Sequence, residues 1–390
     1  MTAHEHRVPA ANMPAGDTPV GGVGGAGTAG RRLRLARQAR GYSQQQLAGM
    51  AGVSRQAVSA VESGHSDPSL RAALALSEAL GMTVEELFGP GEPAPAVVAT
   101  PVAPPGGPGA RAVLAAVGAT YAALPLAGDG AMRAGFLPAG GIIAGTPDGD
   151  IQAVPVRPIG PPRPTLVVAG CDPALPLLEV PLALLDPPVG FAWWPCGSAE
   201  ALSLASRGLV HVAGVHPSGT GKRDLAGAGV VGFSSWREGL VLRTGLAGSV
   251  SGLADIARQH LRLVNREPGS EARRLLDRER SRLGLAAGSL PGYDTRAKGH
   301  LQVASSVAAG LADAGVASEP AALAYGLAFV PLADERFDLV IPRSQQGTRE
   351  VQGLLRVLAS PWLLAQLASL PGYDPAQCGE QVEQVASLAG

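Results

Sequence analysis

Residues 41–64, GYSQQQLAGMAGVSRQAVSAVESG, predict two short helices joined by a tight turn. Ser43 and Ser54 each precede a helical pattern and suit the N-cap position, because a serine hydroxyl accepts a hydrogen bond from a first-turn N–H group. Gly52 permits the turn between the helices, since glycine adopts left-handed backbone conformations without steric cost. Small and apolar side chains are expected to face inward: Leu47, Ala48, Ala51, Val53, Ala57, Val58 and Val61.

The outward face of the second helix carries polar side chains that can contact DNA: Arg55, Gln56 and Ser59. They stand in the first turns of the helix, where a helix in the major groove meets base edges. Segments 31–40, 70–80 and 83–88 carry helical patterns or start signals that complete a small bundle. The sequence therefore predicts an all-α DNA-binding head.

The segment from Arg31 to Gly89 resembles the helix-turn-helix domain of the Cro/phage-repressor, or xenobiotic-response-element, family. The matching residues are Arg37, Gly41-Tyr42-Ser43-Gln44, Leu47-Ala48, Gly52-Val53-Ser54, Val58, Glu62-Ser63-Gly64, Pro68 and Ala79-Leu80-Gly81. The resemblance implies that double-stranded operator DNA is the partner. The candidate DNA-binding residues are Arg37, Ser43, Gln44, Ser54, Arg55, Gln56 and Ser59. For any one of them, a solvated helix face is the alternative.

Composition limits the kind of protein. A length of 390 residues suggests two or three domains. The 31 basic and 32 acidic residues argue against a chain coated for nonspecific nucleic-acid binding, so DNA affinity must come from a local patch, doubled by homodimerisation. Three scattered cysteines do not form a disulfide framework. Because the sequence has no signal-peptide pattern and no long apolar run, we expect a cytoplasmic protein without a membrane partner.

Shifts in composition divide the chain. We expect a disordered tail (1–30), the helix-turn-helix domain (31–89), a proline-rich linker (90–110), a small β-rich connecting element (111–164) and a ligand-binding domain (165–390). The tail is rich in Gly, Ala and Pro without periodicity. In the connecting element, short apolar runs broken by Gly and Pro indicate strands.

From Thr165 the pattern becomes strand, loop and helix, repeated. Continuously apolar strands that alternate with helices indicate a parallel sheet covered on both faces. Ligands of such sheets bind beyond the carboxyl ends of the strands. A second block after Val230 repeats the scheme with crossing strands, a strand pair over residues 328–343 and a closing helix at 350–370. The expected fold class is an all-α head followed by an α/β domain of two lobes.

Residues 165–373 resemble a type II periplasmic-binding-protein fold, and more specifically the molybdate-binding-protein-like domain found fused to transcription-factor heads. The matching segments are 169–175, 197–198, 211–216, 265–266, 269–270 with Arg273, 292–293, 312–315 and 337–342. The resemblance implies a molybdate-like oxyanion as effector, with no cofactor and no metal. One departure is that Glu271-Ala272 stand where the family often has Gly-Thr, so a hydroxyl donor is missing.

Helix N-termini, serine hydroxyls and arginines are expected to converge on one cleft and to suit an anion. The candidate ligand-binding residues are Cys171, Asp172, Cys196, Gly197, Ser198, Asn265, Arg266, Gly269, Ser270, Arg273 and Asp313. The alternative is that Ser198 and Ser270 are only N-caps. Likewise, Arg273 could pair with Asp277 at the i,i+4 distance instead.

Two further interpretations stay open. Cys171 and Cys196, with His211 and His216, could form a soft metal site or a thiol switch, although cysteine is commonly a small buried apolar residue. An enzyme is not expected: the chain lacks a G-x-S-x-G elbow and an H-E-x-x-H pair, and segment 217–222 only superficially resembles a phosphate loop. The expected function is a one-component transcriptional regulator that senses a small ligand. The alternative is a constitutive regulator whose C-terminal domain only dimerises.

Overall fold

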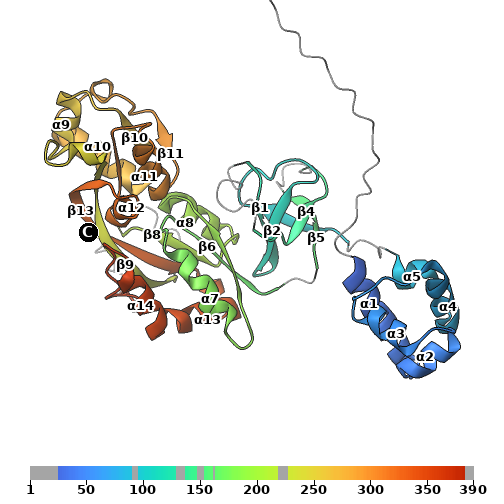
Figure 1. Cartoon of the computed structure of the whole chain (residues 1–390). Coiled ribbons are helices and arrows are strands. Elements are labelled where there is room, and N and C mark those ends of the chain that lie inside the picture. Colours follow the sequence, from blue (N-terminus) through green and yellow to red (C-terminus); the bar gives the residue numbers. More distant parts are fainter. Residues whose placement is uncertain are drawn as a thin grey trace, which may run out of the picture. The chain divides into compact units, whose positions relative to one another are not determined.

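The computed structural model describes residues 25–89, 95–128, 137–146, 153–160, 163–217 and 227–382. The chain forms two compact units, Met1–Pro93 and Ala94–Gly390, which are described separately (Figure 1). Among the described helices, none is long and apolar enough to cross a membrane. The part of the predicted phosphate-loop-like segment that covers residues 218–222 lies outside the described residues.

The N-terminal unit is a helical bundle, as predicted. Its helices are α1 (Gly25–Ala39), α2 (Gln44–Met50), α3 (Arg55–Glu62), α4 (Leu70–Leu80) and α5 (Val84–Phe88). They enclose a core of Leu33, Leu47, Ala48, Ala51, Val58, Val61, Leu76, Leu80 and Leu87. Ala57, which was expected to face inward, is exposed on α3.

The first helix begins earlier than predicted. It starts at Gly25, so the disordered tail predicted over residues 1–30 is too long; residues 1–24 lie outside the described residues. A Cβ atom on Gly30 would lie 2.2 Å from the carbonyl oxygen of Val61. The same glycine that makes the segment look unstructured in the sequence therefore allows α1 to approach the end of α3 closely.

The expected β-rich element is a closed five-stranded barrel. Its strands are β1 (Val97–Pro101), β2 (Arg111–Val117), β3 (Thr120–Pro125), β4 (Gly141–Ile143) and β5 (Val154–Pro158), in the order β1-β3-β2-β4-β5. Strand β1 lies inside the predicted linker over 90–110, so that boundary was wrong. Its prolines suggested a linker, but Pro101 stands at the end of the strand, where proline is tolerated. Barrel residues, among them Val117 and Leu124, share a core with the first lobe of the domain that follows.

The rest of the chain is built on one eight-stranded sheet in the order β11-β10-β12-β9-β13-β8-β6-β7. Its shorter strands are β6 (Thr165–Ala169), β7 (Gly190–Trp194), β8 (Val212–Val215), β10 (Leu263–Arg266), β11 (Arg296–Ala297) and β12 (Ala314–Ser318). The helices are α7 (Glu179–Ala183), α8 (Ser198–Ser206), α9 (Leu253–Arg258), α10 (Glu271–Arg282), α11 (His300–Ala308), α12 (Glu319–Ala324), α13 (Arg349–Leu358) and α14 (Pro361–Ser369).

Two long antiparallel strands join the lobes. Strands β9 (Gly229–Leu242) and β13 (Ala328–Ile341) pair along their whole length, with irregularities next to Pro331 and Phe337. At one end β13 pairs with β8, which belongs to the first lobe with β6 and β7. At the other end β9 pairs with β12, which belongs to the second lobe with β10 and β11. Figure 1 shows both strands running from one lobe to the other.

Two details differ from the sequence-based expectations. Residues 328–341 form one strand, not a strand pair. The closing helix predicted over 350–370 is two helices, because Ser360 caps a new helix and Pro361 occupies its first turn. Both differences leave the predicted α/β fold with two lobes unchanged.

Candidate functional site

The outward face of α3 is available to a partner. Arg55, Gln56 and Ser59 are exposed on this helix, as the sequence predicted. Ser54 caps α3 by accepting a hydrogen bond from the Ala57 N–H at 3.0 Å, and Ser43 caps α2 in a reciprocal capping box with Gln46. The caps fix the helix that presents the three polar side chains.

Arg37 and Gln44 belong to a buried network around Glu62. Arg37 Nε donates to Glu62 Oε1 at 2.6 Å, and Gln44 Nε2 donates to Glu62 Oε2 at 2.9 Å. A further Arg37 N–H donates to the carbonyl oxygen of Tyr42 at 2.7 Å. Burial acts to raise the pKa of Glu62, but the hydrogen bonds from Arg37 and Gln44 outweigh it and lower the pKa. The guanidinium of Arg37 is thus hydrogen-bonded within the bundle, and the DNA contact predicted for Arg37 stays a prediction.

A second group of polar side chains gathers where the two lobes meet, and we call it the interlobe cluster. Its members are Cys171, His216, Trp236, Glu238, Arg266, His300, Ser318 and Glu335. Four of the strands supply members at or just after their carboxyl ends, which are β6, β8, β10 and β12. The two long strands supply Trp236, Glu238 and Glu335 from their middle, and His300 begins α11. The cluster thus lies where sheets of this kind bind ligands.

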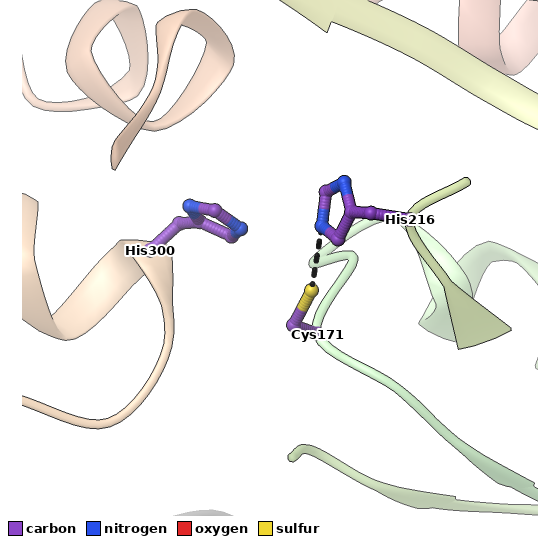
Figure 2. A group of neighbouring side chains, drawn as sticks. All are labelled: Cys171, His216 and His300. Atoms are coloured by element: carbon purple, nitrogen blue, oxygen red, sulfur yellow. Dashed lines mark hydrogen bonds between the residues drawn. The ribbon is translucent and has the colours of Figure 1, made fainter. Parts of the chain in front are cut away.

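His216 stands at the centre of the cluster. Its Nε2 lies 3.3 Å from Cys171 Sγ, and its Nδ1 lies 3.2 Å from Glu335 Oε2. Figure 2 shows the hydrogen bond to Cys171, with the ring of His300 facing the pair from another element. Burial acts against a charge on His216, but Cys171 and Glu335 outweigh it and raise its pKa well above the usual value.

Several buried polar atoms of the cluster have no hydrogen-bond partner among the described residues. They are Trp236 Nε1, Glu238 Oε1 and Oε2, Arg266 Nη1, His300 Nε2 and Ser318 Oγ. Each such atom lowers the stability of the folded state by about 1–3 kcal/mol when it stays unpaired, and by more when the group is charged. Buried polar groups are nearly always paired in native proteins, so a concentration of exceptions marks the interlobe cluster as a candidate site.

Glu238 and His300 are neighbours without a direct bond. His300 Nδ1 lies 3.8 Å from Glu238 Oε1, beyond hydrogen-bond distance. That nitrogen instead accepts a hydrogen bond from the Ser318 backbone N–H at 3.1 Å. Burial and the nearby charge of Arg266 lower the pKa of His300 well below its usual value, so this imidazole is neutral and the contact is no ion pair. Burial raises the pKa of Glu238 to about 7, against the effect of His216.

Comparisons with known proteins agree with the two units. Residues 33–87 match the family model described as Helix-turn-helix, and residues 181–359 match the model described as PBP superfamily domain. An uncharacterized HTH-type transcriptional regulator of Bacillus subtilis, YgzD, is 46% identical over 48 residues, which are 12% of this chain and 73% of that protein. The chain belongs to the xenobiotic-response-element type of helix-turn-helix proteins. It carries a PBP superfamily domain as its second part.

Two further similarities are with an uncharacterized protein and with a solved structure. The uncharacterized protein YvgK of Bacillus subtilis is 32% identical over 146 residues, which are 37% of this chain and 47% of YvgK, so the chain spans about half the length of this relative. The structure of a tungstate ABC transporter from Geobacter sulfurreducens shares 13% identity and covers 52% of this chain and 97% of that chain, with a TM-score of 0.42. A likeness of this size supports no statement about the ligand.

Few of the predicted ligand-binding residues of the PBP domain belong to the interlobe cluster. Cys171 and Arg266 belong to it, and Ser198 touches it, because its hydroxyl accepts a hydrogen bond from the His216 N–H at 3.1 Å. Gly197 and Gly269 face each other at the starts of α8 and α10, where a Cβ on Gly197 would lie 3.5 Å from the Gly269 carbonyl oxygen. A ligand contact by these glycines remains a prediction.

The side chains of other predicted residues are occupied by the protein itself. Ser270 caps α10 and donates to the Glu267 carbonyl oxygen at 2.9 Å. Arg273 pairs with Asp277 at 3.5 Å, and Asn265 donates to the carbonyl oxygen of Tyr293. The structure thus contains both alternative contacts considered from the sequence: Ser270 is an N-cap, and Arg273 forms the i,i+4 ion pair with Asp277. These three side chains hold the second lobe together.

Asp172 and Asp313 are also structural. The buried Asp172 carboxylate accepts hydrogen bonds from the Ala174 N–H at 2.8 Å and from the hydroxyls of Ser234 and Tyr373, both at 2.7 Å. Asp313 precedes β12 and pairs with Arg262 at 3.1 Å. It therefore lies at the amino end of the strand, and the carboxyl end carries Ser318. The ion pair with Arg262 is the contact that Asp313 makes here, and a ligand contact by Asp313 stays a prediction.

The cysteine pair suggested by the sequence is not brought together. Cys196 lies in the core that the first lobe shares with the barrel, whereas Cys171 lies in the core on α7 and α13. His211 is buried as well, and its Nδ1 accepts a hydrogen bond from the Val167 N–H at 3.1 Å. Burial lowers the pKa of His211 to about 4, so it is neutral. Of the four residues in the predicted thiol or metal group, Cys171 and His216 lie together. Their neighbours are His300, Glu238 and Glu335.

Sequence reasoning missed the members of the cluster that the long strands and α11 supply. Trp236 and Glu238 alternate on one face of β9, and Glu335 pairs with Trp236 across the sheet. The available signal was a glutamate within a strand of mostly apolar and small residues, GVVGFSSWREGLVL, because a glutamate is rarely buried without a partner. His300 begins α11 and had no neighbouring motif to mark it.

Proposed function

We propose that this chain is a one-component transcriptional regulator that binds operator DNA through α3 and senses a small ligand between the lobes of its PBP domain. The observation that carries the proposal is the interlobe cluster. A chain that joins a DNA-binding domain to a binding-protein domain has unpaired buried polar atoms where the lobes meet. We further propose that the protein acts in the cytoplasm as a homodimer, because operators of such domains commonly consist of two half-sites.

The mechanism is a coupling between two binding events. A ligand that binds one arrangement of the lobes better than another shifts the chain toward that arrangement. If the two arrangements differ in their affinity for the operator, ligand binding changes the affinity of the protein for DNA. DNA binding then changes the affinity of the protein for the ligand by the same free energy. The strands β9 and β13 are the elements that would transmit the change, because they alone among the described strands run through both lobes.

A ligand panel tests the sensing role. Full-length protein would be heated with molybdate, tungstate, sulfate, phosphate, divalent metals and small organic metabolites. A ligand at a hundred times its dissociation constant stabilises the folded state by about 2.7 kcal/mol, which raises the melting temperature of the C-terminal unit by a few degrees. If no compound produces such a rise, the C-terminal unit is a dimerisation scaffold and the sensing role is refuted.

Replacing Arg55 by alanine is expected to weaken DNA binding without unfolding the domain. Arg55 is exposed and does not belong to the core of the helix-turn-helix domain, so the melting temperature should not change. The loss of an arginine that contacts a base costs about 1–3 kcal/mol, or roughly 5- to 150-fold in affinity. Fluorescence anisotropy on a duplex selected by the wild-type chain measures this. Arg71→Ala, which removes an exposed arginine from α4, is the matched control. Equal losses for both variants would argue against base reading by α3.

A further inference from the structure

We propose that the interlobe cluster is a binding site for a divalent transition-metal ion, held by His216, Glu238 and Glu335. One nitrogen or oxygen from each of these buried residues lies within 4.8 Å of the others. A single ion placed between them needs only small shifts to reach the roughly 2.0–2.2 Å of Zn–N and Zn–O bonds. The proposal deepens the proposed function by naming the class of ligand. It rests on that function only where it links metal binding to a change in DNA affinity.

Two groups of side chains could hold such an ion. The position of the proton on the histidine rings distinguishes between them. The first is Cys171, His216 and His300, shown in Figure 2. His300 Nδ1 accepts the Ser318 backbone N–H, so the neutral ring carries its proton on Nε2. A protonated nitrogen has no lone pair for a metal. The Nε2 atom that would have to coordinate is therefore a donor, and the first group lacks a ligand.

The second group has no such conflict. His216 Nδ1 faces Glu335 at 3.2 Å, and His216 Nε2 faces Cys171 Sγ at 3.3 Å. With the ion on Nδ1, the ring keeps its proton on Nε2 and donates it to the sulfur. Metal-binding histidines usually donate their second N–H to a fixed acceptor, which holds the ring in place. Cys171 then positions His216 and does not bind the ion.

The charges of the cluster favour a cation. Arg266 is already neutralised by Glu267, to which it donates two hydrogen bonds of 2.8 Å. A histidine that binds a metal is neutral, so with the ion in place Glu238 and Glu335 have no cationic side chain bonded to them in the described part of the chain. Glu238 is fully buried, and neither of its carboxylate oxygens has a hydrogen-bond partner among the described residues. A fully ionised oxyanion at this point would face two carboxylates, whereas a divalent ion would satisfy both.

The donor set indicates the kind of ion. One imidazole and two carboxylates suit Zn²⁺, Co²⁺, Fe²⁺ or Mn²⁺, and imidazole disfavours Mg²⁺ and Ca²⁺. Because the site draws one ligand from the residue after β8 and one from each long strand, an ion bound there contacts the elements that join the lobes. Metal binding can therefore stabilise one arrangement of the lobes.

The test uses full-length protein freed of metal with EDTA and then titrated with Co²⁺ and Zn²⁺. We expect visible Co²⁺ absorption that Zn²⁺ abolishes, and a rise in the melting temperature of the C-terminal unit with Zn²⁺. Glu238→Gln should lower Zn²⁺ affinity at least about a hundredfold, because even a residue behind the ligands is worth 10- to 100-fold. Cys171→Ser should lower it by about tenfold. Glu179→Gln, an exposed glutamate on α7, and Cys196→Ser should leave it unchanged.

Glu238→Gln also separates a lost ligand from a damaged fold. Without metal, the variant no longer buries an unpaired carboxylate, so it should melt at the same or a higher temperature than the wild type. Loss of the Zn²⁺ effect together with an undiminished metal-free melting temperature supports the proposal. Absence of Co²⁺ and Zn²⁺ binding by the wild type, or equal Zn²⁺ affinity in Glu238→Gln, overturns it. If metal binds and DNA affinity stays constant, the metal site stands and the proposed sensing function is what fails.

Discussion

Replacing Glu62 by alanine is expected to destabilise the helix-turn-helix domain by about 3 kcal/mol and to abolish DNA binding. Glu62 is 5% exposed and accepts hydrogen bonds from Arg37 at 2.6 and 3.0 Å and from Gln44 at 2.9 Å. Removing one partner of a buried charge pair costs about 3–5 kcal/mol, because the remaining charge is left without compensation. For a domain of this size, such a cost lowers the melting temperature by roughly 12 °C or more.

Circular dichroism of the N-terminal unfolding transition measures the effect of Glu62→Ala. The control is Glu78→Ala, because Glu78 is exposed on α4. Its melting temperature should stay within about 2 °C of the wild type, since surface substitutions usually cost less than 0.5 kcal/mol. A similar small shift in Glu62→Ala would show that the Arg37 network does not stabilise the bundle.

The contribution of Glu62 should depend on pH with a definite sign. Its pKa is lower in the folded domain than in the unfolded chain, so its carboxylate stabilises the domain at a pH above the usual glutamate pKa of about 4.3. The stabilisation is lost as the pH falls through the folded-state value. The stability difference between wild type and Glu62→Ala should therefore be full at pH 7 and should shrink toward pH 3. A constant difference would argue against ionisation of Glu62.

Replacing Gly239 by alanine is expected to disrupt the two strands that join the lobes. An added Cβ would lie 2.1 Å from the Val330 carbonyl oxygen and 2.9 Å from the Pro331 Cα, both in the backbone of β13. Backbone atoms in a paired strand cannot rotate away, so the pairing must shift. Overpacking of this kind costs typically 1–3 kcal/mol and sometimes more, and we expect about 3 kcal/mol here.

Urea unfolding of the C-terminal unit measures the cost of Gly239→Ala. Gly245→Ala is the matched control, because a Cβ at this exposed glycine would meet no atom within 4 Å. Glu238 is next to Gly239, so the variant should also weaken Zn²⁺ binding if the metal site is correct. Equal midpoints for Gly239→Ala and Gly245→Ala would show that β9 and β13 tolerate displacement.

The sequence was sufficient for the features that depend on neighbouring residues. Ser43, Gly52 and Ser54 act within a few residues of themselves, so the caps and the turn could be predicted with their positions. The rule that ligands lie at the carboxyl ends of strands led to Cys171 and Arg266, because each follows or ends a recognisable apolar strand. Neither case needs knowledge of which strand pairs with which.

Features that depend on pairing between distant segments could not be predicted. The barrel is closed by parallel pairing of β1 with β3 and antiparallel pairing of β1 with β5, and β1 looked like part of a linker. Glu238 and Glu335 come together because β9 and β13 pair along their whole length, with register shifts next to Pro331 and Phe337. Likewise, the role of Arg37 depends on Glu62, which is 25 residues away on another helix.

The central claim is that a ligand between the lobes controls DNA binding. The most direct test is the affinity of the full-length chain for a selected operator, at one fixed salt concentration, with EDTA, with Zn²⁺ and with molybdate. We predict that Zn²⁺ changes the dissociation constant at least about fivefold, the lower end of typical couplings between sites, and that Glu238→Gln removes the change. An operator affinity that neither Zn²⁺ nor molybdate alters, in protein shown to bind one of them, would contradict the account.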